Sequence, residues 1–252
     1  MTVYCLYFSP CGSSRACAQA AAGGVSRDFV EVNLTNRTEE FPAAGKGDVL
    51  VVAAPVYSGR IPSPLAQKLL RARLDGAVSL ALVVYGNRAY EDALIELTDL
   101  LAAAGAPSIA AGAFIARHVF VPEVAKDRPN AADLAQLKAL GERTRQKLEA
   151  GDVAAVTVPG NRPYRAAPPA AAVPVVDASS CQKCGLCAFN CPTGAINPKN
   201  PHETDIALCI DCMRCVNCCP EGARSLPEKM LALVTQKLSP LAAVTRENEF
   251  FC

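Results

Sequence analysis

Apolar positions in the first 150 residues follow two alternating patterns. Short unbroken apolar runs are typical of parallel strands buried on both faces, whereas apolar residues three or four positions apart are typical of helices. The predicted strands are Thr2–Phe8, Phe29–Leu34, Val49–Ala54, Val78–Tyr85 and Ser108–Ala116. The predicted helices are Ser14–Ala22, Pro64–Leu74, Tyr90–Ala104 and Ala131–Ala150.

End signals support several of these helices. Asn87 and Asn130 are predicted N-caps, and Gly23-Gly24, Gly105 and Gly151 are predicted stops. Five strands that alternate with helices predict a doubly wound parallel sheet with right-handed crossovers. With five strands, the flavodoxin-like order 2-1-3-4-5 is favoured over other three-layer α/β arrangements.

The pattern changes after residue 151. Pro163–Pro174 is rich in Pro and Ala, which predicts a semi-rigid extended linker. A cysteine-rich unit follows, and then a tail in which Glu228–Leu238 has helical apolar spacing. The predicted organisation is an α/β domain (1–151), a linker (152–178), a small α+β cysteine-rich domain (179–226) and a helical tail (227–252).

The cysteine-rich unit contains an internal repeat. Its first copy, CQKCGLCAFNCP, starts at Cys181, and its second copy, CIDCMRCVNCCP, starts 28 residues later at Cys209. Each copy has the spacing C-x₂-C-x₂-C-x₃-C-P apart from one extra cysteine in the second. Three thiolates at this spacing wrap one [4Fe–4S] cube, and the fourth cysteine reaches the other cube.

The spacing therefore predicts two [4Fe–4S] clusters with crossed ligands. The first would be held by Cys181, Cys184, Cys187 and Cys219, and the second by Cys209, Cys212, Cys215 and Cys191. Zinc also binds C-x₂-C pairs, but two four-cysteine runs followed by proline fit it poorly. Cys218 is an alternative ligand, although the repeat register and the proline after Cys219 favour Cys219.

Composition narrows the classes of function. The 252 residues include 13 cysteines, 51% hydrophobic residues and a net charge of +1, which gives no indication of nucleic-acid binding. No apolar run is long enough for a membrane span, and no signal peptide is apparent, so a reducing cytoplasm is expected. Dense cysteine in that compartment indicates metal or redox chemistry.

The first predicted strand leads into a loop rich in Gly and hydroxyl groups and then into a helix. Such a turn is suited to an anion, because backbone N–H groups and the helix dipole face the ligand. No Walker lysine and no G-x-G-x-x-G motif is present, so a monophosphate such as that of FMN is favoured over a nucleoside triphosphate or a nicotinamide dinucleotide. The phosphate-loop candidates are Ser9, Cys11, Gly12, Ser13 and Ser14.

Two further loops follow the third and fourth strands. In a doubly wound sheet they lie at the carboxyl edge beside the first loop, where ligands bind. Tyrosines there can cover a flavin ring, and glycines let the backbone approach it. The candidates are Pro55, Val56, Tyr57, Ser58 and Gly59 in one loop and Tyr85, Gly86, Asn87, Arg88 and Tyr90 in the other.

Both halves resemble known families. Residues 179–226 resemble bacterial two-cluster ferredoxins, and the whole chain resembles the flavodoxin–ferredoxin fusions of anaerobes. Ser9, Gly12 and Ser14 match the phosphate loop of flavodoxins, whereas Cys11 stands where Thr or Ser is usual. The resemblance implies FMN and a low-potential one-electron relay.

The favoured function is electron transfer between FMN, two [4Fe–4S] clusters and a partner redox protein. A flavin exchanges electrons singly or in pairs, whereas each cubane exchanges one at a time. One alternative is a flavin-dependent reductase of a small acceptor, with Arg60, Arg88, Arg117 and Tyr90 around an open cleft. Another is a redox sensor or scaffold. The sequence leaves enzyme status, electron donor and acceptor, and oligomeric state open.

Overall fold

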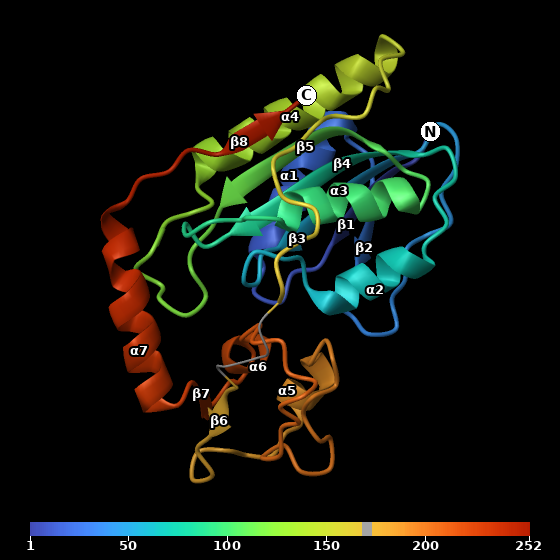
Figure 1. The fold of residues 1–252 in the computed structure, drawn as a ribbon. Coiled ribbons are helices and arrows are strands. Elements are labelled where there is room, and N and C mark those ends of the chain that lie inside the picture. Colours follow the sequence, from blue (N-terminus) through green and yellow to red (C-terminus); the bar gives the residue numbers. More distant parts are fainter. Residues whose placement is uncertain (168–172) are drawn as a thin grey trace.

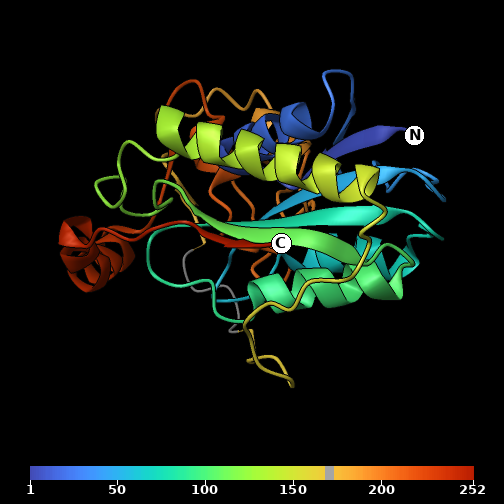
Figure 2. The same cartoon turned by 90° about the horizontal axis from the view of Figure 1, so that it is seen from above.

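The computed structural model describes residues 1–167 and 173–252 of the chain. In the first 150 residues of the chain, helices cover both faces of a central sheet (Figures 1 and 2). The parallel strands are β1 (Val3–Tyr7), β2 (Val30–Asn33), β3 (Val49–Pro55), β4 (Val78–Tyr85) and β5 (Ser108–Ile115). Their order is β2-β1-β3-β4-β5, which confirms the predicted flavodoxin-like arrangement.

The sheet separates two apolar clusters. Successive side chains of a strand point to opposite faces, so Leu50 and Val52 join one cluster while Val49 and Val51 join the other. The helices α2 (Ser63–Arg71) and α3 (Ala93–Ala103) complete the first cluster. The helices α1 (Ser13–Val25) and α4 (Ala131–Glu149) complete the second.

Two glycines set the distance between α1 and α4. A Cβ atom on Gly24 would lie 2.0 Å from the carbonyl oxygen of Lys138, and one on Gly141 would lie 2.0 Å from that of Ala21. The prediction that Gly23-Gly24 ends the first helix was wrong, because α1 continues to Val25. Gly24 serves helix packing instead of helix termination.

The third helix starts later than predicted. Asn87 is not its N-cap and Tyr90 is not helical, because α3 begins only after Asp92. The Asp92 carboxylate does not cap the helix. It accepts hydrogen bonds from the backbone N–H groups of Asn161 and Arg165, at 2.8 and 2.7 Å, and so ties the following segment to the helix start.

The segment that precedes residue 168 packs on α3. Val158 is buried in the core, Arg162 forms an ion pair with Asp99, and the Tyr164 hydroxyl donates to the same carboxylate at 2.6 Å. The first part of the predicted linker is thus packed on the α/β unit. The predicted extended stretch Pro163–Pro174 falls partly on residues 168–172, which lie outside the described residues.

The cysteine-rich unit is small and has mixed secondary structure, as predicted. Two short helices, α5 (Leu186–Asn190) and α6 (Arg214–Asn217), accompany a two-stranded antiparallel sheet of β6 (Val175–Val176) and β7 (Arg224–Ser225). Figure 1 shows this unit, in orange, to one side of the main sheet, with α6 the nearer of its helices.

The tail returns to the main sheet. Its helix α7 has the predicted bounds Glu228–Leu238, and its apolar residues Val234 and Leu238 pack on Phe120, Val121 and Val124. After a 3-10 turn, η1 (Ser239–Ala243), strand β8 (Glu249–Phe251) pairs antiparallel with β5 (Figure 2). The sheet therefore has six strands where five were predicted.

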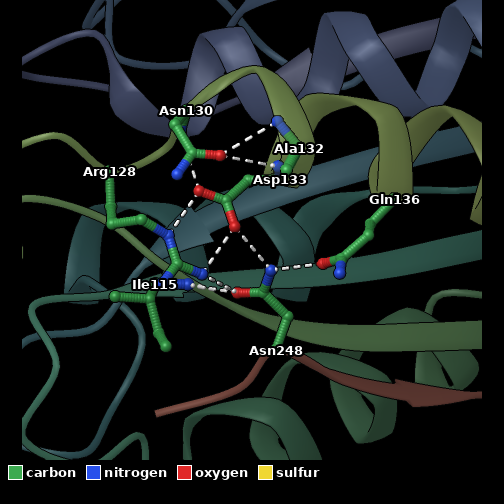
Figure 3. Close-up of polar contacts among 7 residues, drawn as sticks. All are labelled: Ile115, Arg128, Asn130, Ala132, Asp133, Gln136 and Asn248. Carbon is green, nitrogen blue, oxygen red and sulfur yellow. Dashed lines mark hydrogen bonds and ion pairs between the residues drawn. The ribbon is translucent and has the colours of Figure 1, made fainter. Parts of the chain in front are cut away.

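Asn248 anchors this returning strand (Figure 3). Its side-chain oxygen accepts from the backbone N–H of Ile115 at 3.0 Å, and its amide group donates to Asp133 and Gln136 at 2.8 and 2.6 Å. Asp133 is also paired with Arg128. The segment 239–251, here called the C-terminal strap, is thus attached through a buried polar network.

Candidate functional site

Each predicted set of four cysteines lines a cavity of its own. Cys181, Cys184, Cys187 and Cys219 surround one cavity, and Cys191, Cys209, Cys212 and Cys215 surround the other. Each set combines three cysteines of one repeat copy with the fourth of the other. This crossed grouping suits two cubanes, and the donor chemistry of four thiols fits an iron–sulfur cluster.

The backbone turns in the same way in both copies. Lys183 and Gly185 have positive φ angles in the first copy, and Asp211 and Met213 have them at the equivalent positions of the second. A left-handed conformation at a residue other than Gly or Asn is uncommon and is kept only where the surroundings fix it. The repeated turns wrap the cysteines of each copy around their cavity.

Within the described residues, no group of three or more His, Cys, Asp or Glu side chains has the geometry to hold a single metal ion. The cysteines of each set border a cavity and do not converge on one point. Burial raises the pKa of the Cys215 thiol to about 11. Burial also opposes ionisation of Cys191, but hydrogen bonds from Thr193 and nearby backbone N–H groups lower its pKa overall.

The predicted phosphate loop lies between β1 and α1. The Ser9 hydroxyl accepts from the backbone N–H of Arg15 at 3.0 Å, and the Ser9 N–H donates to the Thr35 hydroxyl at 2.7 Å. Gly12 has a φ of 96°, is exposed, and has no atom within 4 Å of the position that a Cβ would take. The loop is therefore closed at its base and open at its tip, an arrangement that fits an anion at the start of α1.

The same loop touches the cysteine-rich unit. The Cys11 thiol donates to the carbonyl oxygen of Cys212 at 3.3 Å, and the Asn217 amide donates to the Cys11 sulfur at 3.3 Å. Arg214 donates to the carbonyl oxygens of Ser9 and Pro10 at 3.5 and 3.4 Å. The phosphate-loop candidates thus lie directly against the second cysteine run.

The loop after β3 borders this contact. Ser58 and Gly59 both have positive φ angles and form a tight turn between Tyr57 and Arg60. A Cβ on Gly59 would lie 1.9 Å from a carboxylate oxygen of Glu91 and 2.9 Å from its Cβ, so another residue there would displace Glu91 and would be strained at a φ of 83°. Burial raises the pKa of Tyr57, and negative charge on the neighbouring Cys212 and Cys11 raises it further. Tyr57 therefore lies near the junction of the two units.

Two side chains of the loop after β4 contact another part of the chain. The Asn87 amide donates to the carbonyl oxygens of Leu241 and Val244 at 3.1 and 2.7 Å, and the Tyr90 hydroxyl donates to Glu249 at 2.6 Å. These side chains hold the C-terminal strap. No local sequence signal reveals this role, because the strap is more than 150 positions away.

Two arginines expected at an open cleft are also engaged. Arg60 makes a two-point contact with Glu96, at 2.7 Å for each bond, and Arg88 pairs with Glu91 at 2.7 Å. Of the other candidates in this loop, Tyr85 is buried in the core and Gly86 lies against His118. A Cβ on Gly86 would lie 2.5 Å from the His118 ring. Burial and then the Arg88 charge lower the pKa of His118 to about 4.

Strand order and paired cysteine sets define the chain as a flavodoxin-like α/β fold followed by a two-cluster ferredoxin domain. Residues 180–224 match the family described as 4Fe-4S dicluster domain. An uncharacterised ferredoxin of Methanocaldococcus jannaschii is 38% identical over 65 residues. That match covers 26% of this chain and 41% of the relative, so the chain spans less than half of that protein.

Solved flavodoxins are similar to the α/β part at low identity. One from the domain Archaea is 16% identical, with a TM-score of 0.44, over 59% of this chain and 99% of its own. One from Streptococcus pneumoniae TIGR4 is 13% identical, with a TM-score of 0.41, over 58% and 99%. None of the helices in the described ranges combines the length and apolar character needed to cross a membrane.

Proposed function

We propose that the chain is an electron-transfer flavoprotein that relays electrons between FMN, two [4Fe–4S] clusters and a partner redox protein. The cysteine sets described above hold the clusters. FMN supplies the exchange of electrons singly or in pairs, and each cluster accepts one electron at a time. The residues from Ser9 to Ser14 bind the phosphate, and those from Pro55 to Gly59 lie beside the flavin ring, with Tyr85 and Gly86 behind them.

The contact between Cys11 and Cys212 carries this proposal. It joins the phosphate loop to a ligand of the second cluster through one hydrogen bond of 3.3 Å. Arg214 and Asn217 of α6 hold the two segments together on either side. The second cluster is therefore the one that exchanges electrons with the flavin, and the first cluster lies farther along the route.

The first test is a cofactor count on anaerobically purified protein. We expect about eight iron atoms, eight sulfides and one FMN per chain, from two cubanes and one flavin site. Eight irons with no flavin, and no uptake of added FMN, would refute the flavin half of the proposal and leave the clusters.

A charge variant locates the FMN phosphate. Ser13 is the first residue of α1, where an added carboxylate favours the helix but repels a phosphate. Ser13→Asp should weaken FMN binding at least about tenfold and leave riboflavin binding unchanged, since riboflavin has no phosphate. Flavin fluorescence measures both affinities.

Ser63→Asp is the matched control, because Ser63 is the exposed first residue of α2. It adds the same charge at another helix start and should leave FMN affinity unchanged. If both variants weaken FMN equally, or if Ser13→Asp weakens riboflavin as much as FMN, the phosphate does not bind at α1.

A further inference from the structure

The two copies of the cysteine repeat have different surroundings. The repeat register makes α5 equivalent to α6, with Leu186 at the position of Arg214 and Phe189 at the position of Asn217. In the second copy, Arg214 and Asn217 contact the phosphate loop of the α/β unit. The α6 face is therefore an interface within the chain.

The equivalent face of the first copy is uncovered and apolar. Phe189 is 81% exposed, Leu186 is 43% exposed, and the cluster cysteine Cys184 is also exposed. Its counterpart in the second copy, Cys212, lies under the phosphate loop. An exposed aromatic side chain and an exposed leucine on one short helix, beside a cysteine of the first set, form an apolar patch, and such patches mark interaction sites.

We propose that Cys184, Leu186 and Phe189, here called the α5 face, form the docking surface for an external one-electron redox protein. The inference rests on the proposed function and names where the relay meets its partner. One electron passes from the reduced centre of that partner to the first cluster, and no bond or proton is transferred. The first cluster thus faces the partner as the second faces the phosphate loop.

The chemistry of the α5 face defines the kind of partner that fits. The helix sequence LCAFN carries no charge, so an apolar surface around the partner's own cofactor is complementary to it. Association through such a face depends on burial of Phe189 and less on charge. We therefore expect the rate of transfer to depend weakly on salt.

The test follows reduction of the anaerobic holoprotein by two donors. One is the methyl viologen radical, which needs no docking surface. The other is the dialysed soluble protein fraction of the organism that encodes the chain, supplied with pyruvate or NADH. Cluster absorbance reports the rate. Phe189→Asp should slow reduction by the protein fraction at least about tenfold and leave the viologen rate unchanged.

Leu70→Asp is the matched control, because Leu70 is a 67% exposed leucine on α2 of the α/β unit. It should leave both rates unchanged, and Leu186→Ser should show a smaller loss than Phe189→Asp. Iron content verifies that each variant keeps both clusters, so a loss of rate is not a loss of fold.

Several results would overturn the proposal. One such result is that the protein fraction does not reduce the wild type. Another is that it reduces Phe189→Asp as fast as the wild type. A third is that Leu70→Asp slows reduction by the protein fraction as much as Phe189→Asp does. A wild-type dimer that Phe189→Asp converts into a monomer would show that a second copy covers the face. Failure of the relay itself is distinguishable, because viologen-reduced clusters would then not reduce the bound flavin in the wild type.

Discussion

The α/β unit and the cysteine-rich unit are stabilised in different ways. The largest fully buried side chains among the described residues, such as Phe8, Leu50 and Phe114, all belong to the α/β unit. Half of the buried apolar residues described in the cysteine-rich unit are alanines, and the apolar cluster around Met213 and Leu226 is completed by Val119 and Phe120 of the α/β unit. The first unit has a large core, whereas the second has very little.

This difference shows what each unit needs in order to fold. Burial of apolar surface contributes about 25 cal/mol per Å², which is sufficient only when enough surface is buried. Units of about 50 residues commonly depend on metals or disulfides in addition. The cysteine-rich unit should therefore depend on its clusters and on its attachments, while the α/β unit should fold without them.

Removal of iron should have the largest effect and tests the comparison directly. When both clusters are stripped with a chelator under anaerobic conditions, we expect the cysteine-rich unit to unfold because the cluster bonds supply most of its stability. Hydrogen exchange should show loss of protection in α5, α6 and β7, with β1, β3 and β4 unchanged. Retained protection around Cys209 without iron would contradict the comparison.

The C-terminal strap should contribute next. Asn248 is 7% exposed and makes hydrogen bonds to Ile115, Asp133 and Gln136. Asn248→Ala leaves their polar groups without these partners, so the free energy of unfolding of the α/β unit should fall by about 2–4 kcal/mol. Urea unfolding measures it.

Asn200→Ala is the control for the strap, because the Asn200 side chain makes only local contacts in a turn, an exposed one to Glu203 and a long one of 3.4 Å from the His202 N–H. Its cost should be about 0.5 kcal/mol or less. If the two variants cost the same, the buried network of Figure 3 does not stabilise the strap.

The regular parts of both units were predictable from local pattern. Val78–Tyr85 is apolar at every position except Ser79, and the structure has β4 with those bounds. The parallel sheet follows from alternation with helices, and the dicluster domain follows from the spacing of its cysteines. In each case the residues that determine the element lie close together in the sequence.

The remaining features depend on contacts between distant segments. Glu249–Phe251 is too short to identify as a strand by itself, and only pairing with β5 makes it one. Asn87 lies in a loop with turn chemistry, so a cofactor contact or a cap was a reasonable expectation. Its contacts with Leu241 and Val244 depend on the path of the tail, which no local pattern specifies.

The acid sensitivity of the α/β unit should depend on His118. Its folded pKa of about 4 lies below the usual value of 6.5, so the unfolded chain binds a proton at a higher pH than the folded chain. The stabilisation from the neutral ring is complete above pH 6.5 and is lost as the pH falls toward 4. The loss should reach up to about 3 kcal/mol.

His118→Gln removes this titration and provides the comparison. Unfolding free energies of the wild type and the variant, measured between pH 4 and 7, should approach each other as the pH falls. A constant difference across that range would mean that His118 does not have a lowered pKa in the folded protein.

The attachment of residues 162–164 to α3 should have the smallest effect. The Arg162 and Asp99 side chains are 61% and 30% exposed, so solvent screens their ion pair and its contribution is small. Asp99→Asn also weakens the bond from Tyr164, and it should cost about 1 kcal/mol or less in urea unfolding. Glu149→Gln, which removes an exposed ion pair within α4, is the matched control and should cost less still. If Asp99→Asn lowered the free energy of unfolding as much as Asn248→Ala does, the attachment of residues 162–164 would stabilise the protein as much as the strap does.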